Sequence, residues 1–318
     1  KSPFANVGKV SSRGFDGNFS FKQKINQVNL TVRGNITYSK NEIIERDEAN
    51  NVYPYQMQKG YRVNQNKGLI SLGLFKDYDD IRNSPTQQYG PVMPGDIKYK
   101  DVNGDGVIDD SDRTFIGNPN PDFYYGFNIN MEYKGFDLSM FFQGVAGNEI
   151  YDVTKYFRYS NVAYNGVWEN LNYLSYSNVA KDYFDKVWRP VPDPANPSYR
   201  DHWGANLNGT VPLPSSDGTK NEMNFRNSDF YIQDGSYLRL KNIQLGYTFP
   251  KKWVNKLSVS NLRVYASATN LFTITSYDGL DPEVGKTSGQ ESNNLYLGID
   301  QGVYPQARSY MFGVIIDF

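Results

Sequence analysis

The fold is decided by the stretch Phe123 to Phe142, which reads FYYGFNINMEYKGFDLSMFF. From Phe123 to Tyr133 every second residue is apolar, and the residues between them are mostly polar. A period of two places these two sets on opposite faces of a β-strand. Lys134 and Gly135 interrupt the alternation, which resumes at Phe136. The stretch therefore predicts two antiparallel strands joined by a tight turn.

The same alternation extends outward to five further segments. They are Phe15–Phe21, Val28–Tyr38, Ile243–Phe249, Leu262–Ala268 and Tyr310–Phe318. The first two are expected to pair as a second hairpin, with a turn at residues 25–27. Leu238 and Leu240 have the wrong parity relative to Ile243, which predicts a β-bulge near Asn242. In total the sequence predicts seven strands of roughly ten residues, long enough to cross a bilayer at a tilt.

The connections between these strands differ in length on the two sides. One side has short turns, whereas the other has long polar loops at about 40–122 and 148–234 and a shorter one before Tyr310. This asymmetry is typical of outer-membrane barrels. The predicted fold class is all-β, an antiparallel transmembrane β-barrel segment that occupies residues 1–318. The apolar run Gly68–Lys76 is either a loop element or one of a pair of extra strands.

Composition excludes several functions. The 318 residues include 33 Lys and Arg against 34 Asp and Glu, one His and no Cys. Near-zero net charge without a basic stripe argues against nucleic-acid binding, and the lack of Cys excludes disulfides and Cys-based metal sites. No apolar run approaches the 18 residues or more that a membrane-spanning helix needs. The chain begins KSPFANVG without a leader, which predicts a mature domain, a processed chain or a fragment.

A calcium-binding pattern lies at Asp101–Asp112, which reads DVNGDGVIDDSD. Oxygen ligands at alternate positions converge on a hard cation when the backbone coils around it, and Gly106 permits the sharp turn. The candidate ligands are Asp101, Asn103, Asp105, the carbonyl of Val107, Asp109 and Asp112. The alternative is a turn rich in Asn, Asp and Gly that only resembles such a site. A calcium ion here would have a structural role.

No catalytic arrangement is evident, and the chain is predicted not to be an enzyme. His202 lies near Asp201, but no GxSxG motif is present, so a solvated loop histidine is favoured. Glu42, Glu45 and Glu48 resemble a charged loop more than a glycosidase pair.

The long loops also contain helical and aromatic segments. Helices are predicted within Val179–Trp188 and, as a single turn, within Asp77–Asn83. Several loop aromatics could stack on sugar rings or pack against a partner, although packing within the loop is an equally good interpretation. The candidates for a substrate or partner contact are Tyr156, Tyr159, Trp168, Trp188 and Trp203.

Four segments of the chain resemble the C-terminal barrel portion of SusC/RagA-type TonB-dependent outer-membrane transporters of the Bacteroidetes. They are NVGKVSSRGFDGNFSF, GDIKYKDVNGDGVIDDSDRTFIGNPNPDFYYGFNINMEYKGFDLSMFFQG, SYLRLKNIQLGYTFP, and RVYASATNLF together with the ending YMFGVIIDF. The terminal Phe318 completes an amphipathic strand, as in bacterial outer-membrane barrels. The calcium pattern followed by the hairpin is the most specific of these features.

The resemblance implies a cell outer membrane location and a 22-stranded barrel that imports glycan oligosaccharides or peptides. It also implies a SusD-like surface lipoprotein as partner, and coupling to the TonB–ExbB–ExbD complex through an N-terminal plug that this chain lacks. Seven strands should not close alone, so the remaining N-terminal part of the same transporter is expected to complete the barrel. The polar positions Arg33, Asn128, Asn130, Glu132 and Arg263 would face the lumen, and the apolar positions would face the lipid bilayer.

Two alternatives remain at this point. A passive outer-membrane porin or adhesin barrel would share the strand pattern. A secreted calcium- and carbohydrate-binding β module is disfavoured, because its sheets would need a dry core instead of polar faces.

Overall fold

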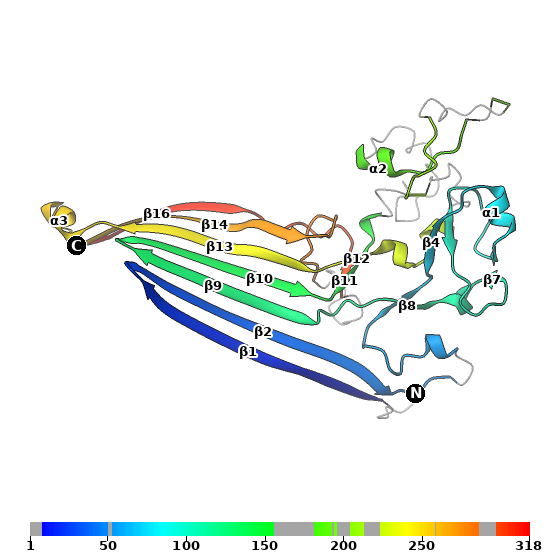
Figure 1. The fold of residues 1–318 in the computed structure, drawn as a ribbon, viewed down its shortest axis with the longest axis horizontal. Helices are drawn as coiled ribbons and strands as arrows, with labels where there is room; N and C mark the ends of the chain where they lie inside the picture. The colour runs from blue at the N-terminus through cyan, green and yellow to red at the C-terminus, as the bar shows by residue number, and fades with distance from the viewer. Residues whose placement is uncertain are drawn as a thin grey trace, which may run out of the picture.

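In the computed structural model the chain forms a long antiparallel sheet with a group of loops at one end (Figure 1). The structure describes residues 8–49, 53–155, 181–192, 194–195, 204–212, 223–257, 259–285 and 297–318. The sheet contains the seven predicted strands in chain order, which confirms that prediction. They are β1 (Lys9–Ile25), β2 (Val28–Glu45), β9 (Phe123–Tyr133), β10 (Phe136–Ala146), β13 (Tyr237–Thr248), β14 (Asn261–Thr275) and β16 (Ser309–Asp317).

Two tight turns join strands at the end opposite the loops. β1 and β2 are joined by residues 26 and 27, of which Asn26 has φ 55°. β9 and β10 are joined by Lys134 and Gly135, with φ 46° and 88°. Positive φ at both central residues, as at Lys134 and Gly135, is a geometry whose twist matches that of antiparallel strands, and in the first turn only Asn26 has positive φ. Both predicted turns are confirmed.

A β-bulge lies in β13. In the register with β10, Asn242 and Leu240 pair with the consecutive residues Phe141 and Phe142, so Lys241 is an extra residue in this strand. The register with β14 also shifts between Leu240 and Asn242. The extra residue puts Leu238 and Leu240 on the same face as Ile243, which explains their parity in the sequence. The predicted bulge is confirmed.

The register aligns the alternating residues into two continuous faces. One row across the apolar face is Val32, Ile129, Met140, Ile243, Ala268 and Tyr310. The next row, on the other face, is polar at Thr31, Asn130, Ser139, Gln244 and Ser267 and ends at Met311 of β16. A sheet with one apolar and one polar face suits a boundary between lipid and water.

Aromatic side chains border the apolar face at both ends. At the loop end the ring of Tyr38 lies 5.7 Å from that of Phe15 and 4.9 Å from that of Phe123, between centroids. At the turn end Phe136 packs on Tyr247 at 4.5 Å. β9 has 11 residues between these borders, and at about 3.4 Å per residue and a tilt of about 45° it spans roughly 25 Å. This is the height of the apolar band of an outer-membrane barrel.

β1 and β2 are longer than expected, with 17 and 18 residues. Beyond Phe15 and Tyr38 their pairing continues past the aromatic border toward the loops. Glu42 and Glu45 therefore lie in β2, and the prediction that they belong to a charged loop is wrong. Glu48 lies beyond the strand and accepts a hydrogen bond from the backbone N–H of residue 58 at 2.7 Å.

An ion pair crosses the polar face over a glycine. Arg263 of β14 donates from Nε and Nη2 to Asp137 of β10, at 3.0 and 2.5 Å. Gly246 of β13 lies between them, and a Cβ there would overlap with both side chains. We expect Gly246→Ala to destabilise the barrel by about 1–3 kcal/mol, measured by denaturant unfolding in detergent.

Gly17→Ala is the matched control for this substitution. A Cβ at residue 17 would meet Ile36 Cγ2 at 3.8 Å, which is an ordinary contact. Its stability should stay within about 0.5 kcal/mol of the parent. Equal losses in the two variants would contradict the role assigned to Gly246.

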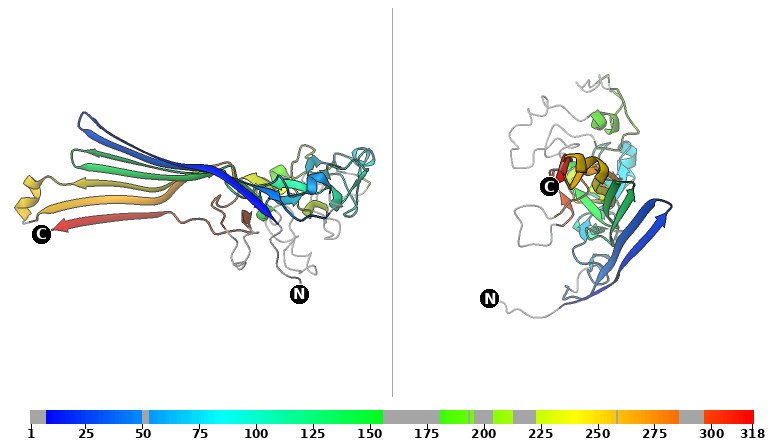
Figure 2. Two further views of the ribbon diagram at one scale, coloured as in Figure 1. Left: turned by 90° about the horizontal axis from the view of Figure 1, so that it is seen from below. Right: turned by 90° about the vertical axis from the view of Figure 1, so that its left-hand side faces the viewer.

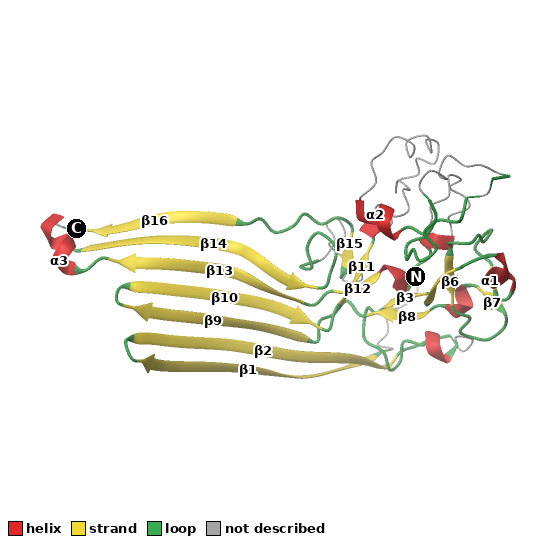
Figure 3. Ribbon diagram, turned by 45° about the horizontal axis from the view of Figure 1, so that its top comes forward, coloured by secondary structure: helices red, strands yellow, loops and turns green. Residues whose placement is uncertain are grey.

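Short elements occupy the loops (Figure 3). Small sheets pair β3 (Asn66–Gly68) with β8 (Thr114–Gly117), β4 (Ser71–Leu74) with β6 (Ile97–Tyr99), and β5 (Thr86–Gln87) with β7 (Val107–Ile108). A fourth orders β12 (Ile232–Asp234), β11 (Glu149–Asp152) and β15 (Ile299–Asp300). The helices are α1 (Tyr78–Arg82), α2 (Lys181–Lys186) and α3 (Lys251–Val254), with 3₁₀ turns at Pro54–Gln56, Asp110–Asp112, Asp229–Tyr231 and Asn255–Leu257.

These elements test three predictions from the sequence. The run Gly68–Lys76 contributes to β3 and β4 and lies outside the seven-stranded sheet. α1 confirms the predicted turn at Asp77–Asn83, where the Asp77 side chain accepts from the N–H of Asp80 at 2.7 Å as N-cap. α2 lies within the helix predicted at Val179–Trp188. Among the described residues, no helix is long and apolar enough to cross a membrane.

The sheet is curved, and its edges lie apart (Figure 2). In the part of the chain that the structure describes, β1 pairs only with β2 and β16 only with β14. Each edge strand therefore has one side available for a further strand.

Candidate functional site

Two loops that are distant in the sequence fold together at the loop end of the sheet. We call residues 53–122 and 223–235 the loop assembly. Its core comprises Leu69, Ile97, Tyr99, Ile108 and Met223, all at most 1% exposed. Met223 comes from the second loop and the others from the first. The two loops are therefore one packed unit in place of the separate loops that the sequence suggested.

Buried amide side chains complete the backbone pairing of this core. Gln87 donates from Nε2 to the carbonyl of Ile97 at 3.1 Å and accepts from the N–H of Tyr99 at 2.7 Å. Asn224 accepts from the N–H of Ile97 at 2.8 Å and donates to Asp96 Oδ1 at 2.8 Å. Because buried polar groups destabilise a fold when they lack partners, these contacts hold the two loops in one arrangement.

Asp96 makes the loop assembly sensitive to pH. Burial raises the pKa of Asp96 to about 6, although bonds from Met93 N–H and Asn224 lower it. Between the unfolded pKa of about 4 and pH 6 the folded state binds more protons, so stability falls as pH rises. We expect a loss of about 2 kcal/mol over this window. Asp96→Asn should abolish this part of the dependence, seen as a smaller difference in melting temperature between pH 4.5 and pH 6.5; an unchanged difference would contradict the assignment.

In the candidate calcium loop, side-chain oxygens accept hydrogen bonds from the backbone further along the chain. Asp101, Asn103 and Asp105 each accept hydrogen bonds from backbone N–H groups two to five residues further on, at 2.6 to 3.0 Å. Gly104 and Gly106 have φ 78° and 84°, which an L side chain rarely adopts. These turns coil the backbone around the side chains of positions 1, 3 and 5.

Asp112 closes the loop from inside. Its side chain is fully buried, and Oδ1 accepts from the N–H of Val102 at 2.7 Å while Oδ2 accepts from that of Asp109 at 2.9 Å. Asp109 in turn accepts from the N–H of Ser111 at 2.7 Å, and the reciprocal bonds between Asp109 and Asp112 form a capping box at the start of the 3₁₀ turn. The first and last thirds of the loop are thus joined by one carboxylate.

The donor set suits a hard cation. All six candidate ligands present oxygen, and each accepting carboxylate oxygen has a second lone pair beyond the hydrogen bond described above. In the described part of the chain, no three His, Cys, Asp or Glu side chains form a metal-holding group on their own. A cation in this loop would therefore also need Asn103 and the carbonyl of Val107.

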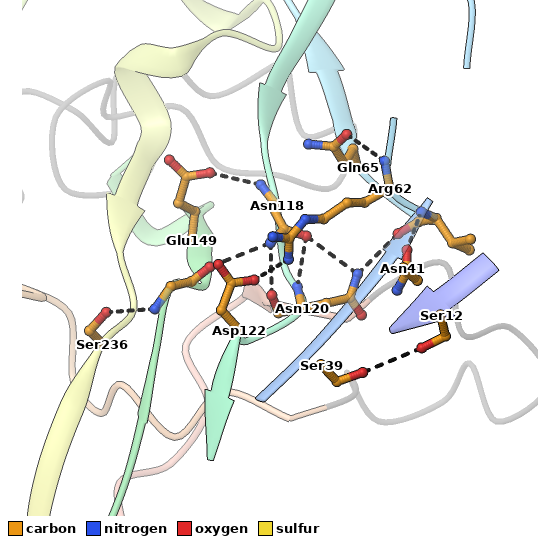
Figure 4. A network of polar contacts seen from close by, with 12 residues as sticks. Ser12, Ser39, Asn41, Arg62, Gln65, Asn118, Asn120, Asp122, Glu149 and Ser236 are labelled. Carbon is orange, nitrogen blue, oxygen red and sulfur yellow. Dashed lines mark hydrogen bonds and ion pairs between the residues drawn. The ribbon is translucent and has the colours of Figure 1, made fainter. Parts of the chain in front are cut away.

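A polar network attaches the loop assembly to the strands (Figure 4). Arg62 forms an ion pair with Asp122, which directly precedes β9. The N–H of Val63 donates to Asn41 of β2 at 2.9 Å, and its carbonyl accepts from Asn120 at 3.0 Å. These contacts fix the loop assembly over the ends of β2 and β9.

A buried ion cluster lies at the loop end of the polar face. Arg239 of β13 is 3% exposed and donates to Asp281 at 2.5 Å and to Glu283 at 2.8 Å, and Lys241 also reaches Glu283 at 2.6 Å. Burial raises the pKa of Asp281, but Arg239 and two backbone N–H groups hold it below the usual value. The cluster attaches the loop after β14 to strand β13 of the sheet. Sequence analysis missed it because its carboxylates have no recognisable spacing.

The predicted lumen residues share the polar face. Arg33 is opposite Asn128 in the register of β2 and β9, and Asn130 and Glu132 follow on the same face. Arg263 is on this face too, in its pair with Asp137. The structure therefore brings these five positions to one side of the sheet.

The predicted contact aromatics lie mostly outside the described residues. These are Tyr156, Tyr159, Trp168 and Trp203, and His202 lies there as well. Trp188 is described and is 4% exposed, packed where a Cβ on Gly95 would meet its ring. Its packing favours a role within the loops over direct contact with a ligand.

Comparison with curated proteins finds several relatives, whereas no family model matches the chain. TonB-dependent receptor P26 of Formosa agariphila is 30% identical over 79% of this chain and 22% of the relative. TonB-dependent receptor P3 of the same organism is 26% identical over 100% and 30%. TonB-dependent receptor SusC of Bacteroides thetaiotaomicron is 24% identical over 98% and 27%. The chain thus spans less than a third of the length of these relatives.

Solved structures give the same fold. The RagAB peptide transporter has a TM-score of 0.63 at 20% identity, over 97% of this chain and 29% of that one. The RagAB peptide importer in its open-open state has a TM-score of 0.65 at 20% identity, over 98% and 29%. The all-β fold of this chain is therefore that of part of a larger barrel. Its relatives are receptors and transporters of the outer membrane, not enzymes.

Proposed function

We propose, from the premise that this chain is the counterpart of a C-terminal barrel portion of SusC- and RagA-type TonB-dependent receptors, that it forms part of the wall of an outer-membrane importer. The observation that carries this proposal is the sheet with one continuous apolar face, two aromatic borders and one polar face. The apolar face meets lipid, and the polar face lines the path of the imported molecule.

The sheet has two edge strands, β1 and β16, that can each pair with a further strand, which supports a barrel completed by the rest of the polypeptide. Seven strands are fewer than the eight of the smallest bacterial barrels. Unpaired N–H and C=O groups within lipid are strongly unfavourable, so β1 and β16 each need a neighbouring strand. The remaining N-terminal part of the transporter supplies these strands and the plug through which the TonB–ExbB–ExbD complex acts.

The loop assembly is the proposed docking region for a SusD-like lipoprotein and for substrate. It lies at the end of the sheet opposite the tight turns (Figure 1), which is the extracellular side in this class of barrel. The substrate is a glycan oligosaccharide or a peptide. The likeness to the RagAB peptide transporter supports a peptide, and the likeness to SusC is compatible with a glycan.

The test is purification from outer membranes in detergent, followed by denaturing separation and N-terminal sequencing of each band. Because the chain spans 30% of one relative and 29% of one solved structure, the proposal expects either one polypeptide of about three times this length, or this chain together with a larger N-terminal piece. A lipoprotein should accompany either form. Absence of a lipoprotein from the purified protein, together with ion conductance in planar bilayers that rises in proportion to the salt concentration, would favour the porin or adhesin alternative. A lone chain that is soluble without detergent would favour the secreted binding module.

We also propose that the loop Asp101–Asp112 binds calcium and stiffens the loop assembly. The alternating oxygen donors and the two left-handed glycines support this proposal. Calcium titration of the full-length protein by calorimetry should show one site lost in Asp105→Ala, with Asp79→Ala of α1 as a control that binds normally. Heat release equal in all three proteins, or none in the parent, would reject the site.

A further inference from the structure

A cavity of about 170 Å³ lies in the loop assembly beside the candidate calcium loop. Its walls include Leu69, Tyr89, Asp110, Arg113, Arg226 and Asn227. It is smaller than the roughly 300–1,000 Å³ of pockets that enclose a drug-sized ligand. A cavity of this size fits one unit of a longer ligand, such as a single sugar or the last residue of a peptide.

Two guanidinium groups dominate the charge of the cavity. The guanidinium carbon of Arg226 lies 4.3 Å from the centre of the Tyr89 ring, which fixes the plane of this side chain. Arg113 makes a long hydrogen bond of 3.5 Å to the carbonyl of Lys67. Burial and the neighbouring Asp110 raise the pKa of Tyr89, and the positive charges of Arg226 and Arg113 partly oppose this rise. Both guanidinium groups therefore lie near the Tyr89 hydroxyl.

One carboxylate partly offsets these two cations. Asp110 accepts a hydrogen bond from the Tyr89 hydroxyl at 3.2 Å through Oδ1. Among the described residues that line the cavity, the two positive charges of Arg113 and Arg226 thus accompany one negative charge. Planar guanidinium groups present paired N–H donors that match the two oxygens of a carboxylate.

We propose that this cavity binds a carboxylate group of an extracellular ligand between Arg113 and Arg226. Two sources share this chemistry: a uronic acid in a glycan and the C-terminus of a peptide. This proposal concerns only the binding of a ligand at the loop assembly, and it does not depend on transport of that ligand. Its test needs no transport, so its failure would leave the importer proposal standing.

The test is calorimetry on the full-length protein in detergent with two matched pairs of probes. Glucuronate is compared with glucose, and trialanine with trialanine amide. In at least one pair the acid should bind at least about tenfold more tightly than its neutral analogue, because a charge-assisted hydrogen bond is replaced by a weaker one. Preference confined to glucuronate identifies a glycan source, and preference confined to trialanine identifies a peptide source. Equal affinities within both pairs, or no binding of either acid up to about 20 mM, would overturn the proposal.

Three variants separate charge recognition from folding. Arg113→Gln and Arg226→Gln should each weaken binding of the acid at least about tenfold, and Arg82→Gln on α1, whose guanidinium is exposed, should not. Asp110→Asn keeps an oxygen for Tyr89 and removes the opposing charge, so it should strengthen binding. A purely structural role for these residues predicts no gain in that variant. Unchanged affinity in both arginine variants and in Asp110→Asn, at parental melting temperatures, would overturn the site.

Discussion

Ile129→Arg is expected to destabilise the folded barrel by about 2 to 4 kcal/mol, because a charge at the middle of the lipid-facing surface loses its hydration. Ile129 lies midway along β9, with Val32 and Met140 on either side in the register. Both aromatic borders are therefore about half a strand away. The measurement is equilibrium unfolding of the full-length protein in lipid vesicles with guanidinium chloride.

Asn130→Arg is the matched control, one residue along the same strand. Asn130 is on the polar face between Thr31 and Ser139, and Glu132 is two residues further on. Its change should stay within about 1 kcal/mol, because the new charge remains in water. A larger loss for Asn130→Arg than for Ile129→Arg would contradict the assignment of the apolar face to lipid and of the polar face to water.

The seven strands were predictable because their signal is local. The alternation along each strand predicts which face of the sheet meets water, and the pair Lys134–Gly135 predicts the turn. Both predictions use only residues that are neighbours in the sequence. The bulge at Lys241 was also readable, because it shifts the parity of Leu238 and Leu240. The extra length of β1 and β2 was not, since beyond Phe15 and Tyr38 the outward positions become polar and the alternation ends while the backbone pairing continues.

The loop assembly was not predictable for the opposite reason. Met223 comes from another loop and packs in one cluster with Leu69 and Ile97. The side chain of Gln87 forms hydrogen bonds to the backbone of Ile97 and Tyr99, as a neighbouring strand would. Such contacts depend on tertiary structure and have no period in the sequence. Among the candidate site residues, the calcium pattern was visible because its donors lie within the single stretch Asp101–Asp112, whereas the ion pair of Arg239 with Asp281 joins two distant segments.

Asp112→Ala is expected to destabilise the loop assembly by about 3 kcal/mol or more. The side chain is fully buried and accepts the N–H groups of Val102 and Asp109. Each buried donor left without an acceptor destabilises a fold by about 1–3 kcal/mol. Hydrogen exchange of the segment Asp101–Asp112 in the full-length protein measures the effect, because loss of these bonds should speed exchange by a hundredfold or more at that level of destabilisation.

The same experiment separates the hydrogen bonds of Asp112 from its proposed role as a calcium ligand. With calcium chelated, Asp112→Ala should still exchange faster than the parent, because its hydrogen bonds do not require the metal. With calcium added, the parent should become more protected and the variant should not, since it has lost one ligand. Asp79→Ala removes an exposed ion pair on α1, whose acid is 76% exposed, and should match the parent in both conditions. Equal protection of Asp112→Ala and parent under chelation would show that this carboxylate does not hold the loop.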